Sequence, residues 1–199
     1  HDRVFLNKHP TKSRFFICSC PILNYGDIKL HPKTKLCSMI FSSKTQLDGH
    51  QLRHQIYQEL KDDPQFVFID WFGDGVGKYV NNKIDTLRDY MYSITIENNR
   101  KDFYFTEKIF DNFATGTVPI FWGCPSIGHF FDKGGIKVFN NIEQLKEILL
   151  NISKQEYEKM YPYVERNFQT VQGYVDTDDV AFDTVIKFLK ETGKHKDVV

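Results

Sequence analysis

Short apolar runs alternate along this chain with stretches in which apolar residues recur every three or four positions. The first pattern is typical of buried strands, and the second of helices that pack on one face. We expect strands at residues 36–41, 66–69, 92–96, 118–122 and 136–139. Strands that alternate with helices at this spacing favour an α/β fold built on a parallel, doubly wound sheet.

Polar residues beside the periodic stretches predict where helices begin. Asp48 with Gln51 resembles a capping box, and it precedes a helical face. Asn141 and Ser153 are typical N-caps of two later helices, and Glu156 completes a second capping box behind Ser153.

Three weaker signals predict further helical segments. Residues 84–91 fit a short helix, another helix should start near Thr106, and Asp178 is a candidate cap for a final helix. Pro162 should break or kink the helix that begins at Ser153, because proline lacks the N–H that the helix interior uses.

Charge and composition exclude several classes of protein. Lys plus Arg (26) equal Asp plus Glu (26), so no net field attracts nucleic acid or an anionic membrane. No apolar run approaches about 18 residues, the length of a membrane span, and no signal-peptide pattern opens the chain. The cysteines show no zinc spacing, which fits a reducing compartment. We therefore expect no transmembrane segment, no nucleic-acid partner, and a location in the cytoplasm or at a membrane surface.

The junction between the strand ending at Ile96 and the helix starting near Thr106 is the most informative stretch. In open α/β sheets, ligands bind at the carboxyl ends of the strands. Lys108 falls in the first turn of the helix, where a cation opposes the helix dipole at a cost of about 0.3 kcal/mol or more. An anion bound at the helix start would make the position of Lys108 favourable instead of unfavourable, and phosphate is the obvious candidate. Arg53, one turn into an earlier helix, is either a solvated arginine or a second ligand contact.

Three other motifs each allow two interpretations. The glycine-rich turn at 73–78 lacks the spacing of a phosphate loop, so a flexible βα loop is favoured over one that touches a sugar or phosphate. Asp176 and Asp178 form a DxD pattern that could hold a divalent cation, but aspartates before a helix usually cap it. His50 and His54 lie four apart without a third metal ligand, and we interpret them as surface residues.

Residues 90–131 resemble the C-terminal, donor-binding half of the fucosyltransferases of glycosyltransferase family 10. The matching pieces stand in the same order and at matched spacing: Glu97-Asn98, Tyr104-Phe105-Thr106-Glu107-Lys108, Gly116-Thr117-Val118-Pro119 and Trp122-Gly123-Cys124-Pro125. A weaker likeness runs from Lys35 through about Phe168 and includes Arg53. One departure is Asn99, where the family usually has serine.

The resemblance implies the C-terminal half of a GT-B glycosyltransferase, Rossmann-like in fold, with a nucleotide-sugar donor that is typically GDP-fucose. It implies transfer with inversion, without a cofactor or an obligatory metal. Carried onto this sequence, Arg53 and Lys108 would hold the diphosphate. Glu107 would accept hydrogen bonds from the ribose hydroxyls, and Asn98 and Tyr104 would shape the nucleotide pocket.

The resemblance also sets expectations for domains and partners. Residues 1–34 would be a linker or the remnant of an N-terminal acceptor domain, 35–175 the nucleotide-sugar-binding domain, and 176–199 a C-terminal helix. The missing N-terminal domain would bind the glycan acceptor and supply the catalytic base, so no catalytic residue is assigned here. Two alternatives stay open: a non-catalytic nucleotide-sugar-binding module, and a transferase that uses another nucleotide sugar.

Overall fold

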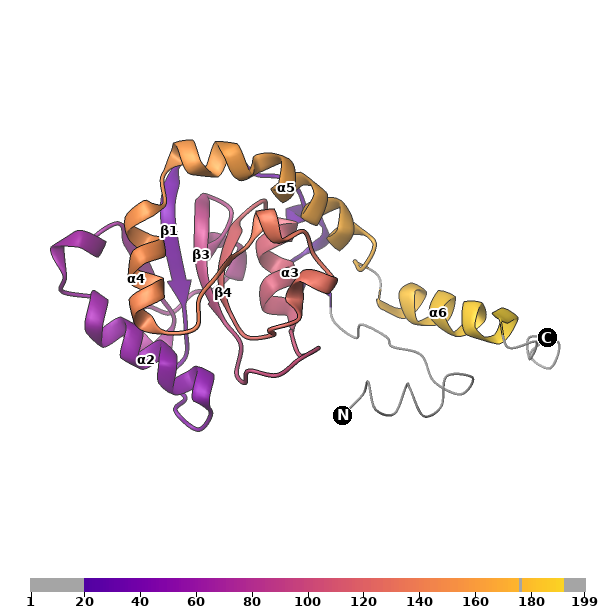
Figure 1. The fold of residues 1–199 in the computed structure, drawn as a ribbon, viewed down its shortest axis with the longest axis horizontal. Coiled ribbons are helices and arrows are strands. Elements are labelled where there is room, and N and C mark those ends of the chain that lie inside the picture. The colour runs from indigo at the N-terminus through magenta and orange to yellow at the C-terminus, as the bar shows by residue number, and fades with distance from the viewer. Residues whose placement is uncertain (1–19, 176, 192–199) are drawn as a thin grey trace.

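Five parallel strands form the central sheet of the computed structural model, which describes residues 20–175 and 177–191. The strands are β1 (Lys35–Ile40), β2 (Ile69–Phe72), β3 (Tyr90–Ile96), β4 (Val118–Trp122) and β5 (Lys137–Val138), in the spatial order β2-β1-β3-β4-β5. Every pairing between neighbours is parallel. The predicted doubly wound α/β sheet is therefore confirmed (Figure 1).

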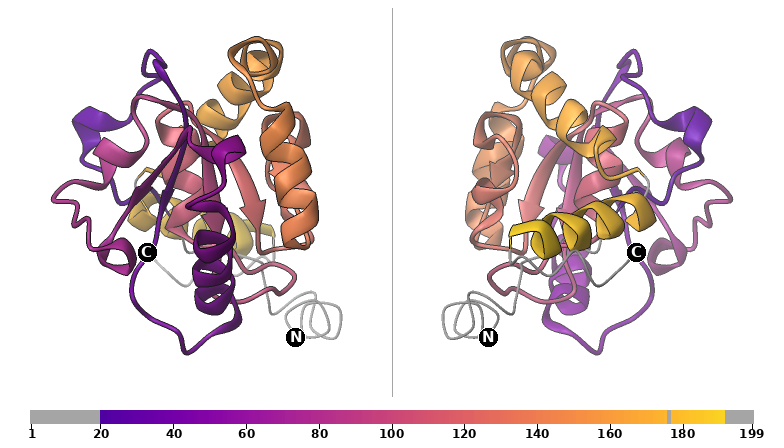
Figure 2. Two further views of the ribbon diagram at one scale, coloured as in Figure 1. Left: turned by 90° about the vertical axis from the view of Figure 1, so that its left-hand side faces the viewer. Right: turned by 90° about the vertical axis from the view of Figure 1, so that its right-hand side faces the viewer.

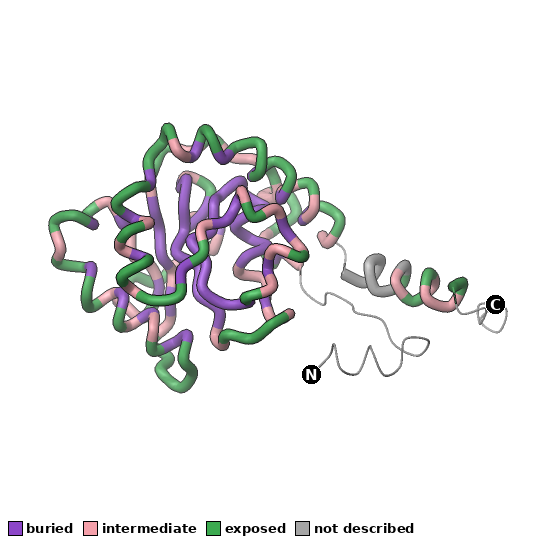
Figure 3. Tube along the Cα trace, viewed as in Figure 1, coloured by how far each residue is buried: buried purple, intermediate pink, exposed green. Residues whose placement is uncertain are grey.

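Helices cover both faces of this sheet. The helices of the described residues are α2 (Asp48–Leu60), α3 (Glu107–Ala114), α4 (Ile142–Asn151), α5 (Lys154–Gln172) and α6 (Thr177–Glu191), of which α6 stands apart from the sheet (Figure 1). Helices α2 and α4 pack on one face and α3 on the other, and each face has its own cluster of buried apolar side chains. The buried strands lie inside and the outer sides of the helices are exposed (Figure 3).

The two central strands explain why the apolar runs were easy to recognise. All residues of β3 and β4 are buried, because helices shield both faces of a parallel sheet. Their register pairs Ile94 with Ile120 and Ile96 with Trp122. Helix α5 lies across the amino ends of the strands (Figures 1 and 2), where the Tyr157 hydroxyl donates to the Gly116 carbonyl at 2.8 Å. The carboxyl ends remain uncovered by α5.

The strand order creates a switch point between β1 and β3. The chain leaves β1 through α2 to reach β2 on one side, and leaves β3 through α3 to reach β4 on the other. The two connections diverge above the carboxyl ends of β1 and β3, which opens a crevice in folds of this kind.

Two predicted elements differ from the structure. Strand β2 begins at Ile69 instead of spanning 66–69, because Phe66 belongs to a 3-10 turn that starts at Pro64. Phe66 is only 2% exposed, so its apolar character reflects the core and not a strand. The helix expected at 84–91 is a 3-10 turn, Lys83–Thr86, after which β3 already begins at Tyr90.

The predicted helix starts at Asn141, at Ser153 and near Thr106 are confirmed, since α3 begins at Glu107 with Thr106 as its N-cap, and the start predicted at Asp48 is wrong. Asn141 accepts a hydrogen bond from the Gln144 N–H at 2.9 Å, and the Ser153 hydroxyl accepts from the Glu156 N–H at 3.1 Å. Asp48 does not cap α2, because it is the first helical residue.

Three other details of the helices also depart from expectation. The Glu156 carboxylate binds the Lys137 ammonium at 2.7 Å instead of closing a capping box. Of the two effects expected at Pro162, the break is absent, since α5 is continuous there, while the helix bends along its length (Figure 1). Asp178 lies inside α6, which begins at Thr177, while Asp176 is outside the described residues, as is Cys18.

The segment just before β1 packs against the domain. The Lys33 ammonium lies within hydrogen-bond distance of four acceptors: the carbonyls of Leu87 (3.1 Å), Arg88 (3.0 Å) and Thr115 (2.8 Å), and the hydroxyl of Thr117 (2.9 Å). Residues 20–34, which we had grouped with a linker or remnant, thus contact two loops at the amino edge of the sheet.

None of the helices in the described parts of the chain combines the length and apolar character needed to cross a bilayer.

Candidate functional site

A cavity of about 360 Å³ opens at the carboxyl ends of β1 and β3, at the switch point. It lies between the first turns of α2 and α3, and its third side is the glycine-rich turn after β2. The lining residues that carry charge or hydrogen-bonding groups include Ser42, Lys44, His50, Arg53, Asp74, Lys83, Asn98, Glu107, Lys108 and Asn112. Strand β1 contributes Ile40 to the wall, and β3 contributes two isoleucines and two hydroxyl residues, Ser93 and Thr95.

Arg53 enters this cavity from α2 and is 6% exposed. Its Nη2 donates to the Ile96 carbonyl and, at 3.1 Å, to the Asn98 Oδ1. Burial lowers the pKa of the guanidinium, while the nearby Glu97 and Tyr104 raise it. Since an arginine keeps its charge in proteins, this is a largely desolvated cation fixed against the end of β3.

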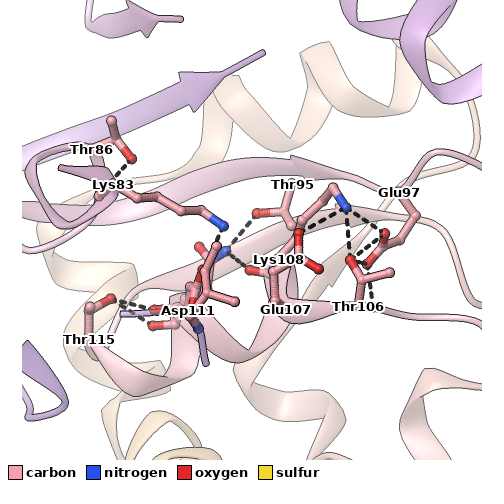
Figure 4. Close-up of polar contacts among 11 residues, drawn as sticks. Lys83, Thr86, Thr95, Glu97, Thr106, Glu107, Lys108, Asp111 and Thr115 are labelled. Carbon is pink, nitrogen blue, oxygen red and sulfur yellow. Dashed lines mark hydrogen bonds and ion pairs between the residues drawn. The ribbon is translucent and has the colours of Figure 1, made fainter. Parts of the chain in front are cut away.

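Glu97 organises the start of α3 (Figure 4). The side chain is fully buried, and its carboxylate accepts from the Thr106 N–H at 2.8 Å and from the Thr106 hydroxyl at 2.9 Å and 3.0 Å. It therefore satisfies a backbone donor at the helix start, a task that the Thr106 side chain does not perform itself. The carboxyl end of β3 and the amino end of α3 are held together by this one side chain.

Lys108 completes the same network. Its ammonium lies 2.8 Å from the Thr106 hydroxyl, 3.3 Å from Glu97 and 3.4 Å from Glu107. The two carboxylates offset the unfavourable placement of a cation at a helix amino end. Lys108 remains 23% exposed and lines the cavity, so a ligand can reach it.

A second lysine, Lys83, approaches α3 from the turn before β3. It forms an ion pair of 2.6 Å with Asp111, which is fully buried (Figure 4). Burial raises the pKa of Asp111, and Lys83 opposes that rise. For Glu107, burial also acts to raise the pKa, but Lys108 and Lys83 outweigh it and the net shift is downward. Glu107 is thus an ionised acceptor at the rim of the cavity.

The amino end of α2 touches the end of β3 backbone to backbone. The Gly49 N–H donates to the Asn98 carbonyl at 3.0 Å, and a Cβ at position 49 would lie 1.8 Å from the Glu97 carbonyl oxygen. Gly123, after β4, also lies close to the Glu97 side chain, since a Cβ there would be 2.7 Å from its Cγ. These close approaches fix both helix starts relative to the strand ends.

Four of the five predicted site residues meet in one cavity, namely Arg53, Asn98, Glu107 and Lys108. Tyr104 is partly buried in the loop before α3 and is not among the residues that line it.

The glycine-rich turn contributes Gly73 and Asp74 to the cavity, and Gly73 has a φ of 103° that favours glycine. The prediction that His50 is a surface residue is wrong: it is 7% exposed and lines the cavity. Lys83 and Asn112 were missed, because their roles depend on contacts between distant segments.

Comparison with known proteins shows which family this chain resembles. The family described as glycosyltransferase family 10 (fucosyltransferase), C-terminal, matches residues 30–197. An alpha-(1,3)-fucosyltransferase, FucT, of Helicobacter pylori is 37% identical over 71 residues, which are 36% of this chain and 14% of that protein. A putative fucosyltransferase-like protein of Arabidopsis thaliana is 37% identical over 49 residues, 25% of this chain and 10% of that protein.

Solved structures agree on the fold. Crystal structures of an alpha1,3-fucosyltransferase with GDP-fucose and with GDP each have a TM-score of 0.51 to this structure, at 21% identity, and cover 87% of this chain. This chain spans about half of theirs, 53% and 52% respectively. The family match covers most of the sequence, and this chain therefore belongs to glycosyltransferase family 10, the fucosyltransferases, and carries the family's C-terminal region.

Proposed function

We propose that this chain binds the nucleotide-sugar donor of a fucosyltransferase, with GDP-fucose as that donor. The single observation that carries the proposal is the meeting of Arg53, Lys108 and Glu107 in one cavity at the switch point. Two helix amino ends converge there, and each adds partial positive charge to that of the side chains. The result is a site suited to a diphosphate flanked by a ribose.

The proposed binding mode follows the positions of the charges. Arg53 and Lys108 contact the diphosphate. The planar guanidinium of arginine and the compact ammonium of lysine both form strong charge-assisted hydrogen bonds with phosphate in a partly desolvated site. Glu107 accepts from the ribose hydroxyls, since its lowered pKa keeps it ionised. Asn98, which accepts a hydrogen bond from Arg53, forms the wall of the nucleotide pocket next to β3.

Transfer requires that the nucleoside diphosphate departs with added negative charge. Fixed cations that face the diphosphate stabilise this charge as it develops, which is the task that a divalent metal performs in other transferases. We therefore propose metal-independent transfer of fucose with inversion to a glycan. In this proposal the acceptor-binding site and the catalytic base belong to the N-terminal half of a complete enzyme.

Calorimetric titration with a panel of ligands tests the donor assignment. We expect GDP-fucose and GDP to bind, UDP and ADP to bind more weakly, and guanosine, which lacks the diphosphate, to show no measurable binding. Absence of binding by every nucleoside diphosphate would refute the proposal. Transferase activity of the full-length gene product towards β-galactoside and N-acetylglucosamine acceptors then separates an enzyme from a non-catalytic donor-binding module.

A further inference from the structure

His50 is a polar residue of the cavity that the binding mode above does not use. His50 lies in the first turn of α2, three residues before Arg53, so both side chains are on the same side of the helix. Both line the cavity, and His50 is 7% exposed. Its Nδ1 is buried and has no hydrogen-bond partner among the described residues. Buried polar atoms are normally satisfied, so an unpartnered nitrogen in a ligand cavity points to a missing contact.

The groups that face the imidazole are mostly cations. Lys44 approaches from the loop after β1, Arg53 from the next turn of α2, and Lys108 from α3, while Asn98 lies at the end of β3. Burial lowers the pKa of His50, these three cations lower it further, and a hydrogen bond with Asn98 opposes the shift. In the free chain the imidazole is therefore neutral at neutral pH.

We propose that His50 is a further donor-binding residue, which takes up a proton as the diphosphate enters and then donates a hydrogen bond to a phosphate oxygen. The inference rests on the proposed function, since it needs a diphosphate in this cavity. The diphosphate neutralises Lys44, Arg53 and Lys108, which removes their repulsion of a charged imidazole and supplies an acceptor for its N–H. His50 thus adds a fourth cation to Lys44, Arg53 and Lys108, and this charge exists only while donor is bound.

Proton uptake gives this inference a distinct signature. Where binding takes up one proton, affinity rises up to tenfold for each unit by which the pH falls. The rise occurs between the pKa of His50 in the free chain and its higher pKa in the complex. We expect donor affinity to be on the order of tenfold tighter at about pH 6 than at about pH 8.

GDP-fucose is the probe to use, because both of its phosphates are esterified and neither titrates in this range, unlike the terminal phosphate of GDP. Calorimetry in buffers of different ionisation enthalpy counts the protons taken up by the unaltered chain, without any substitution. The matched variants are His50→Gln, which removes the titration, and His54→Gln, one turn further along α2 and outside the cavity lining. Their thermal melting confirms that each is folded.

The expected result is proton uptake and pH-dependent affinity in the unaltered chain and in His54→Gln, with both lost in His50→Gln. GDP-fucose binding that is independent of pH in the unaltered chain would overturn the role of His50 and leave the proposed function intact. An equal pH dependence in His50→Gln would also overturn it, because the proton would then enter elsewhere. Failure to bind GDP-fucose at any pH would overturn both.

Discussion

Replacing Lys108 with alanine separates two roles of one side chain. In the free chain its ammonium neutralises the buried Glu97 at 3.3 Å and bonds the Thr106 hydroxyl at 2.8 Å. In the proposed complex the same ammonium contacts the diphosphate. The substitution should therefore weaken both the fold and the binding of GDP, by amounts that can be calculated separately.

For binding, a charge-assisted hydrogen bond contributes about 1.5–3 kcal/mol, so GDP should bind about 10- to 100-fold more weakly. For stability, removing one partner of a buried ion pair costs about 3–5 kcal/mol. Here the cost should be smaller, about 1–3 kcal/mol, because Glu97 keeps its bonds from Thr106. Lys108 is also partly exposed, so water can replace part of its contribution.

Two measurements distinguish these effects. Urea denaturation gives the free energy of unfolding, and calorimetry gives the affinity for GDP. The double variant Glu97→Gln, Lys108→Ala removes the unpaired buried charge, so it should recover stability relative to Lys108→Ala while GDP binding stays weak. Lys101→Ala, an exposed lysine in the loop between β3 and α3, is the control and should change neither quantity.

Tight GDP binding by folded Lys108→Ala, equal to that of the unaltered chain, would refute a contact between Lys108 and the diphosphate. The contact is also refuted if the double variant regains full affinity, since Lys108 would then act only by stabilising the fold.

Four further outcomes follow. Gly49→Ala should lower the free energy of unfolding by about 2 kcal/mol or more in urea, because its Cβ would overlap the Glu97 carbonyl; an unchanged midpoint would contradict the contact. Lys33→Met should cost about 2–4 kcal/mol by the same assay, since it leaves buried carbonyls without their donor, and a neutral effect would show that water replaces it. EDTA should not change the affinity for GDP-fucose, and a large drop would indicate a metal site. The 199-residue chain alone should transfer fucose slowly; robust turnover would place the base within it and make Asp27 and Asp74 the first residues to mutate.

The sequence predicted the sheet well where burial alone decides the pattern. Strands β1 and β4 fall within one residue of their predicted ranges, because helices cover both faces and the two runs are apolar apart from Ser38 in β1. It failed at Phe66, where an apolar side chain reaches the core from a 3-10 turn. It failed again at Asp48, because a capping pattern in sequence does not reveal where helical dihedrals begin.

The sequence predicted those site residues that belong to one continuous motif. Glu107 and Lys108 follow a strand within one junction, and such positions are visible in a single sequence. His50 and Lys83 gave no such signal, because their importance comes from the close approach of α2 and of the turn before β3 to α3. The hydrophobic periodicity of the sequence predicts that His50 and Lys83 are surface or turn residues. They line the cavity only because segments distant in the sequence pack against each other.

The anchoring of Lys33 sets a limit on where the domain can be cut for expression. A fragment that begins at Lys35 would keep every strand and helix of the sheet, and by that criterion it would look complete. It would nevertheless lose the donor shared by Leu87, Arg88 and Thr115, and with it the tie between the two loops at the amino edge. Fragments that include Lys33 should therefore accumulate as folded protein, whereas a fragment that begins at Lys35 should not.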